Sequence, residues 1–244
     1  MKVLNFFNLR TFLALIISQI AAFLAIHYQI KFNLNLMLFG LAVGFPLHFS
    51  IQAAFKRREK ALEYFSMFKG GLMALYYSIQ VAEDVPAEKK MEGTNILKSI
   101  GDQLATQLQN RDATYELIQR KINEIFAFMQ TNLDGLSKRN VIKMIRHVSR
   151  VSEGSVYLVS LTSHRTMVGL RFYSIFFILI FPIVQAPLLL HRLDGVVPSW
   201  GIHVFVALTS LLLITLNNFQ KMIEYPFDQG GIDNIRLKEF KLDV

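Results

Sequence analysis

The sequence predicts an all-α membrane protein with four transmembrane helices in two hairpins and a helical cytoplasmic block between helices 2 and 3. Two observations predict this fold class. Hydrophobic residues make up 52% of the 244 residues and the mean hydropathy is positive, which is too apolar for an ordinary soluble domain. The apolar residues also gather into four stretches, each near the roughly 20 residues that a helix needs to cross a bilayer core of about 30 Å.

The first hairpin is predicted over residues 1–55. Its apolar stretches are 11–30 and 33–55, separated by one short connection. A cleaved signal peptide is the alternative for the first stretch, but the apolar run is too long and no small-residue cleavage site precedes the second stretch. We therefore expect both stretches to remain in the membrane.

The second hairpin is predicted over residues 166–219, from stretches 166–190 and 201–219. A turn-rich segment with Asp194, Gly195 and Pro198 separates them. The stretch 201–219 is the shortest of the four.

Lysine and arginine concentrate between the second and third stretches and are scarce in the short connections. The positive-inside rule then places that region and both termini in the cytoplasm, in a multi-pass protein of the cell inner (plasma) membrane. The formal charge of +8 is explained by this topology and by contact with lipid headgroups, so no nucleic-acid partner is expected.

Residues 56–165 are predicted to form the cytoplasmic helical region, and residues 220–244 a cytoplasmic C-terminal segment. Apolar residues recur in region 56–165 at steps of three and four, the helical period. No glycine or proline lies between Pro46 and Gly70, so the second membrane helix is expected to continue into the cytosol. A helix start is expected at 84–88 around Pro86, and a connection at 134–137.

Enzyme chemistry finds no support in the sequence. It has no glycine-rich phosphate loop, no paired-histidine zinc motif and no Gly-x-Ser-x-Gly elbow. Cysteine is absent, and the six histidines are scattered without ligand spacing. We expect no catalytic residues, no cofactor and no metal site.

The second stretch carries the strongest functional signal. Leu41, Phe45 and Phe49 recur every fourth residue and therefore share one helical stripe. A ring of such side chains, one from each subunit, can form a hydrophobic constriction. The alternative is that the two phenylalanines face lipid or neighbouring helices.

Three other features of this stretch bear on the same prediction. Gly40 and Gly44 are small enough to permit close helix packing. Pro46 has no N–H to donate, which frees the carbonyl of Ala42 and predicts a local bend. His48 is a polar group in a membrane segment, where it is costly unless it faces protein or water.

Residues 45–49 read F-P-L-H-F, and Arg57 follows eight residues later. This stretch resembles the pore helix of bestrophins, whose core reads F-x-L-G-F with an arginine eight residues further on. H-R-T at 164–166 is similar to the opening of the third membrane helix in bacterial members, and Phe-Pro at 181–182 to a part of that helix. The residues from 223 to 237, I-E-Y-P-F followed by I-D-N-I-R-L, are similar to the family's I-E-x-P-F-G and N-D-L-P-L run after helix 4.

The chain departs from the family pattern at three places. His48 replaces a glycine of the core, and Asp228 replaces the glycine that follows Pro-Phe. Arg58 and Glu59 stand where two tryptophans usually follow the arginine. These departures indicate a remote, bacterial-type relative.

The resemblance implies a homopentamer around a central pore that passes small monovalent ions, chloride or other anions in the best-known branch. Its expected partners are membrane lipid, monovalent ions and copies of itself. It carries the pore neck onto Leu41, Phe45 and Phe49. The residues themselves predict a bend at Pro46, and polar pore or interface positions at His48 and Arg57. A structural motif after helix 4 is expected to comprise Glu224, Pro226, Phe227, Asp233 and Asn234.

Calcium is not expected to gate the protein directly. In animal bestrophins a dense acidic string after Pro-Phe-Gly supplies oxygen ligands to one calcium ion. Here residues 228–234 contain two carboxylates, Asp228 and Asp233. A calcium site takes about six to eight oxygens, so this stretch predicts weak binding and a structural role.

Two other functions stay open. One is a subunit of a proton-channel complex, but no Asp or Glu lies inside any of the four predicted stretches. The other is a non-conducting scaffold or signalling partner, because amphipathic cytoplasmic helices also serve as binding modules.

Overall fold

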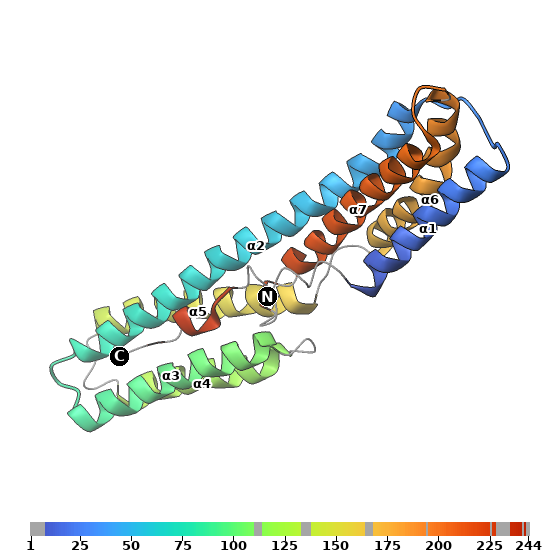
Figure 1. The fold of residues 1–244 in the computed structure, drawn as a ribbon. Helices are drawn as coiled ribbons and strands as arrows, with labels where there is room; N and C mark the ends of the chain where they lie inside the picture. The colour runs from blue at the N-terminus through green and yellow to red at the C-terminus, as the bar shows by residue number, and fades with distance from the viewer. Residues whose placement is uncertain are drawn as a thin grey trace. The chain divides into compact units, whose positions relative to one another are not determined.

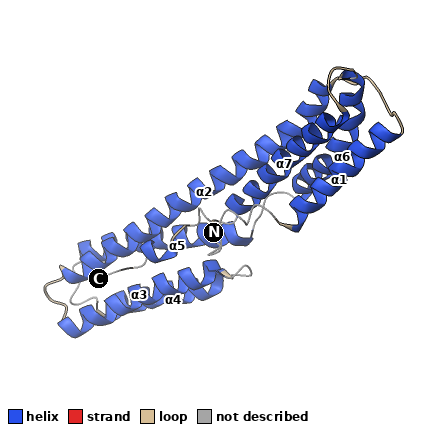
Figure 2. Cartoon of the chain, viewed as in Figure 1, coloured by secondary structure: helices blue, strands red, loops and turns tan. Residues whose placement is uncertain are grey.

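A computed structural model of the chain describes residues 8–109, 114–132, 138–163, 168–193, 195–224, 226–227, 235–240 and 242. In these residues the backbone forms seven α-helices and one short 3-10 helix, with no strand (Figure 2). Four of the helices are long and apolar enough to cross a membrane. The predicted fold class, all-α with four membrane helices, is confirmed.

The four candidate membrane helices are α1 (Leu9–His27), α2 (Leu36–Gln80), α6 (Val168–Arg192) and α7 (Ser199–Glu224). The remaining helices are α3 (Ala87–Gln109), α4 (Tyr115–Thr131), α5 (Lys138–Ser163) and η3 (Leu237–Phe240). The α3 helix begins directly after Pro86, as the sequence predicts, and the amide of Lys90 donates to the Pro86 carbonyl at 3.0 Å.

Two helices continue beyond the apolar stretches from which they were predicted. The fourth stretch, 201–219, lies inside α7, which has 26 residues, whereas α1 has 19. The α7 helix continues past Phe219 to Glu224, and Gln220, Ile223 and Glu224 are buried in this part of it. The α2 helix continues without interruption past Lys56, as expected, and passes Gly70 to end at Gln80.

The chain divides into two compact units, and the division falls inside α2, between Lys56 and Arg57. The membrane unit comprises Met1–Lys56 and Thr166–Glu224, and the second unit comprises Arg57–Arg165 and Tyr225–Val244. In the membrane unit, α1, α6 and α7 pack against one another (Figure 1).

Small residues set the packing of α1. Ala14, Ser18, Ala22 and Ala25 are buried along one face, while larger residues such as Phe12 and Phe23 are exposed. Small side chains let helix backbones approach closely, and large apolar side chains are stable in contact with lipid. The exposed apolar face of α1 is therefore consistent with a membrane location.

The ends of the membrane helices carry local stabilising features. The side chain of Asn8 caps α1, because its Oδ1 accepts from the amides of Arg10 and Thr11 at 3.1 Å each. Gly195 adopts a φ of +73° in the turn between α6 and α7, a conformation that glycine adopts without a Cβ penalty. This glycine belongs to the turn-rich segment predicted from the sequence.

The second unit has a continuous apolar core between α2, α3, α4 and α5. Its fully buried side chains include Phe68, Leu72, Leu75, Leu97, Ile100, Leu104, Ile118, Ile122, Ile125, Met144 and Leu158. They recur at steps of three and four, so the periodicity of the sequence identified the faces that pack.

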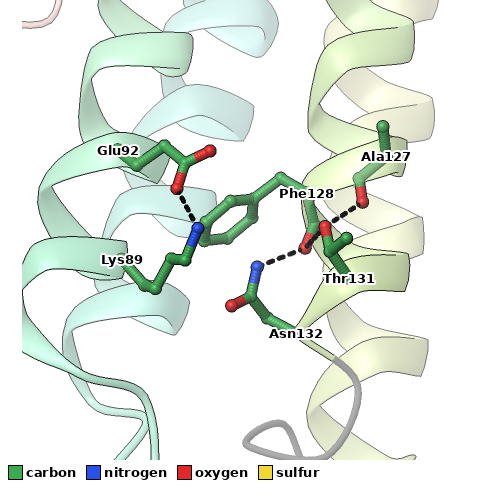
Figure 3. A network of polar contacts seen from close by, with 6 residues as sticks. All are labelled: Lys89, Glu92, Ala127, Phe128, Thr131 and Asn132. Atoms are coloured by element: carbon green, nitrogen blue, oxygen red, sulfur yellow. Dashed lines mark hydrogen bonds and ion pairs between the residues drawn. The ribbon is translucent and has the colours of Figure 1, made fainter.

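The side chain of Phe128, on α4, points toward α3 (Figure 3). A Cβ placed on Gly93 would lie 2.9 Å from the ring of Phe128, so a side chain at this position would displace the ring. The carbonyls near the end of α4 are satisfied locally: the Asn132 amide donates to Phe128 O at 2.8 Å, and the Thr131 hydroxyl donates to Ala127 O at 2.6 Å. These bonds give the Ala127 and Phe128 carbonyls side-chain donors near the end of the helix.

Candidate pore-lining face

One face of α2 in the membrane unit is apolar and exposed. Leu41, Phe45 and Phe49 expose 39%, 55% and 57% of their surface. They lie four residues apart and form the single stripe that the sequence predicts. Large apolar side chains exposed in such a row indicate a surface that contacts lipid, another chain or a pore.

The two phenylalanine rings of this stripe are stacked. The ring centroids of Phe45 and Phe49 lie 6.3 Å apart with an interplanar angle of 19°. The His48 ring meets the Phe49 ring edge-on at 5.8 Å and is itself exposed. The imidazole therefore lies beside the stripe and is not buried between α2 and the neighbouring helices.

The opposite face of α2 fixes the direction of the stripe. Val43 and Leu47 are each 3% exposed, and Val43 packs in a cluster with Ile178 and Ile214. Phe39 stacks on Phe181 with ring centroids 5.6 Å apart. Because α2 buries this face against α6 and α7, the stripe must point away from the other helices of the membrane unit.

Pro46 lies inside α2, and the carbonyl that it frees has a partner. The hydroxyl of Tyr173, on α6, donates to the carbonyl of Ala42 at 3.4 Å. The Tyr173 ring is held in turn by Phe177, whose ring centroid is 4.3 Å away. The acceptor left by the proline is thus satisfied by a neighbouring helix, as membrane proteins require. The bend expected at Pro46 remains a prediction.

Tyr173 is the site residue that the sequence analysis missed. It lies 131 residues from Ala42, and no periodicity or motif connects the two positions. The sequence does predict an unsatisfied carbonyl at Ala42, which needs a hydrogen-bond donor, but it does not indicate which residue supplies that donor.

Gly40 and Gly44 face open space within the described chain. A Cβ placed on either residue would have no neighbouring heavy atom within 4 Å. The close helix packing that these glycines permit therefore has no partner among the described residues of the same chain. The glycines leave room beside the stripe.

Arg57, predicted as a polar pore or interface position, contacts backbone in the second unit. Its Nη2 donates to the carbonyl of Leu161, near the end of α5. The last four carbonyls of a helix have no intrahelical partner, so this guanidinium satisfies one of them.

The residues of the motif after helix 4 fall on both sides of the division between units. Glu224 ends α7, is 1% exposed and lies 4.0 Å from Arg171. Pro226 and Phe227 are buried in the second unit, where the Phe227 ring meets Phe65 edge-on at 5.8 Å. Asp233 and Asn234 lie outside the described residues.

No group of three or more His, Asp or Glu side chains in the described part of the chain could hold a metal ion. Asp228 and Asp233, on which the calcium prediction depends, lie outside that part. The prediction that calcium does not gate the protein therefore stays a prediction.

Solved structures similar to this chain are bacterial bestrophin homologues. A crystal structure of a bacterial bestrophin homologue from Klebsiella pneumoniae matches with a TM-score of 0.76 at 14% identity, covering 95% of this chain and 93% of that one. A single-substitution variant of that homologue gives the same TM-score, identity and coverages. A structure described as a membrane protein matches at TM-score 0.76 and 15% identity, covering 95% and 93%.

No protein-family model and no curated protein matches the sequence. At this identity the structural likeness establishes the fold: the chain has a bestrophin-like fold over nearly its whole length. The remote bestrophin resemblance read from the sequence is confirmed at that level.

Proposed function

We propose that this chain is a subunit of an ion channel that conducts small monovalent ions, chloride or other anions foremost, through a central pore. The neck of the pore is formed by Leu41, Phe45 and Phe49. The observation that carries the proposal is the exposed, stacked apolar stripe on α2, which points away from the other helices of the membrane unit. The bestrophin-like fold supports it.

One chain supplies one such stripe and cannot enclose a pore, so the proposal requires rotational copies. A closed ring of identical subunits brings identical stripes to a common axis, where their side chains form a narrow apolar constriction. We propose a homopentamer, which the family resemblance implies. The open space beside Gly40 and Gly44 leaves room for close approach of a neighbouring copy.

The charge distribution along α2 favours anions. From Leu36 to Arg58 the helix carries no Asp or Glu, and Lys56, Arg57 and Arg58 follow the stripe. Aromatic ring edges are electropositive, so a ring of phenylalanine edges offers anions a weakly favourable contact. A cation-selective pore usually carries a ring of carboxylates, which this segment cannot supply.

The proposed topology follows the sequence-based domains. Residues 1–55 and 166–219 form the transmembrane hairpins, 56–165 the cytoplasmic helical region and 220–244 the cytoplasmic C-terminal segment. Both termini are then cytoplasmic, in the plasma membrane.

A non-conducting scaffold is the second candidate, and a specific feature of the second unit favours it. Helices α4 and α5 expose apolar side chains, with Leu117 48%, Ile142 58% and Ile145 45% exposed. Such a face can bind a partner helix. The proton-channel alternative has less support. Glu224, the buried carboxylate at the end of α7, lies 4.0 Å from the guanidinium of Arg171, and an ion pair with arginine favours a carboxylate that stays charged over one that takes up and releases protons.

The neck is tested by replacing both of its phenylalanines. Phe45→Ala with Phe49→Ala removes two rings per subunit, widens the constriction and lowers its dewetting barrier, so conductance rises or selectivity relaxes. The measurement is anion and cation flux in liposomes that contain the purified protein.

The matched control is Phe172→Ala with Phe176→Ala. These α6 rings are also stacked, at 6.1 Å, and are 70% and 46% exposed, so the control removes a comparable pair of exposed rings from a different helix. Flux should be unchanged in this control. A neck variant that assembles and conducts like the parent contradicts the neck assignment, and a native mass of a monomer or dimer contradicts the channel itself.

A further inference from the structure

Four charged side chains meet at one end of the membrane unit, where α1 and α6 begin and α7 ends. Arg10 lies in the first turn of α1 and Arg171 in the first turn of α6. Lys221 and Glu224 lie in the last turn of α7. The beginning of α1 contacts α7 directly, because the side-chain amide of Asn218 donates to the Thr11 hydroxyl at 3.0 Å.

Positive charge exceeds negative charge in this cluster. Arg10 and Arg171 both lie close enough to Lys221 to repel its ammonium group. Among the residues that the structure describes, Glu224 supplies the carboxylate of this cluster, 4.0 Å from Arg171. With three cations and one anion, these four side chains carry a formal charge of +2.

The cluster is partly removed from water. Glu224 is 1% exposed, and the Arg171 side chain is 24% exposed. The Lys221 Nζ is buried and has no hydrogen-bond partner among the described residues. An ammonium group buried without an acceptor is costly, so the position favours an added anion.

The dipoles of α1 and α6 make the excess positive charge at their N-terminal ends more unfavourable. The first turn of a helix is the positive end of its dipole, where acidic side chains are stabilising and basic ones are not. Neither α1 nor α6 has an acidic residue in its first turn, and each has an arginine there. Two helix ends that break a local rule at the same place indicate a compensating ligand.

We propose that Arg10, Arg171 and Lys221 form a binding site for a phosphate group, and that its source is the headgroup of an anionic phospholipid. Guanidinium and ammonium groups bind phosphate oxygens through strong, charge-assisted hydrogen bonds. The site lies at the ends of three membrane helices, the depth at which lipid headgroups lie. The proposal stands independently of ion conduction.

The test measures lipid binding to the purified full-length protein by native mass spectrometry. The probes are phosphatidic acid and phosphatidylcholine with the same acyl chains, with inorganic phosphate as competitor. Phosphatidic acid should bind more tightly. Arg10→Gln and Lys221→Gln should each weaken its binding about fivefold, the worth of one basic residue at an anionic membrane surface.

Arg192→Gln is the matched control, since it removes one positive charge at the other end of α6, where that side chain donates to the Leu34 carbonyl. It should leave phosphatidic acid binding unchanged. Arg10 is exposed, so Arg10→Gln decides the question even if Lys221→Gln fails to fold.

Two other outcomes are informative. If inorganic phosphate binds with the same sensitivity to both variants and phosphatidic acid does not, the phosphate site stands and its source is soluble. If phosphatidic acid binds no better than phosphatidylcholine and inorganic phosphate does not bind, or if Arg10→Gln and Lys221→Gln behave like Arg192→Gln, the proposal is wrong.

Discussion

Adjacent glycines in α2 provide a direct test of the packing in the second unit. Gly71 is buried against α5, and a Cβ placed on it would lie 2.7 Å from Val151 Cγ2 and 3.2 Å from the carbonyl oxygen of His147. Gly70 is exposed, and a Cβ there would meet nothing within 4 Å. The two positions have the same helical backbone and differ in their surroundings.

The expected magnitudes follow from this difference. Replacing a mid-helix glycine by alanine stabilises the helix by about 1 kcal/mol at either position. At Gly71 the added methyl group must also displace Val151, which is 1% exposed and stiff at χ1, at an overpacking cost of about 1–3 kcal/mol. The helix term cancels between the variants, so Gly71→Ala should be less stable than Gly70→Ala by about 1–3 kcal/mol.

The assay is thermal unfolding of the full-length protein in detergent, followed by circular dichroism. For a chain of this size each kcal/mol shifts Tm by about 2–4 °C, so the two variants should differ by about 2–12 °C. Gly70→Ala should melt at or above the parent. Equal melting temperatures, or a more stable Gly71→Ala variant, would refute the close approach of α2 and α5.

Two further predictions concern Tyr173 and His147. Tyr173→Phe should alter conductance by up to about tenfold, because one hydrogen bond is worth about 0.5–1.5 kcal/mol, and the effect should vanish in a Pro46→Ala background, where residue 46 regains its own donor to Ala42 O. The measurement is ion flux in liposomes for the parent, the two single variants and the double variant. If Tyr173→Phe has the same effect on flux in the Pro46→Ala background, the hydrogen bond from Tyr173 to Ala42 O does not explain it. Burial, with a smaller contribution from Arg150, lowers the pKa of His147 from its usual 6.5. The unfolded chain then binds more protons than the folded one, so stability should be lost as pH falls below about 6.5, and His147→Gln should reduce the loss in Tm between pH 7.5 and 5.5. If Tm falls equally in the parent and in His147→Gln over this pH range, titratable groups other than His147 cause the loss of stability.

Features that depend on local chain geometry could be predicted from the sequence. Hydrophobic length identified four membrane helices, and a step of four residues placed Leu41, Phe45 and Phe49 on one stripe. The missing N–H of proline identified the freed carbonyl of Ala42. These features follow from helical rise and period and from the chemistry of single residues, so neighbouring positions are enough to predict them.

Contacts between residues that are distant in the sequence depend on how the helices pack. The Tyr173 hydroxyl reaches Ala42 across 131 positions, and Arg10, Arg171 and Lys221 converge from three helices. The structure also extends α7 to Glu224, beyond the end that hydropathy indicated, and buries Gln220 and Glu224 there. Helix packing selects such pairs through the fit of whole faces, and periodicity shows which face is buried but not which side chain lies opposite.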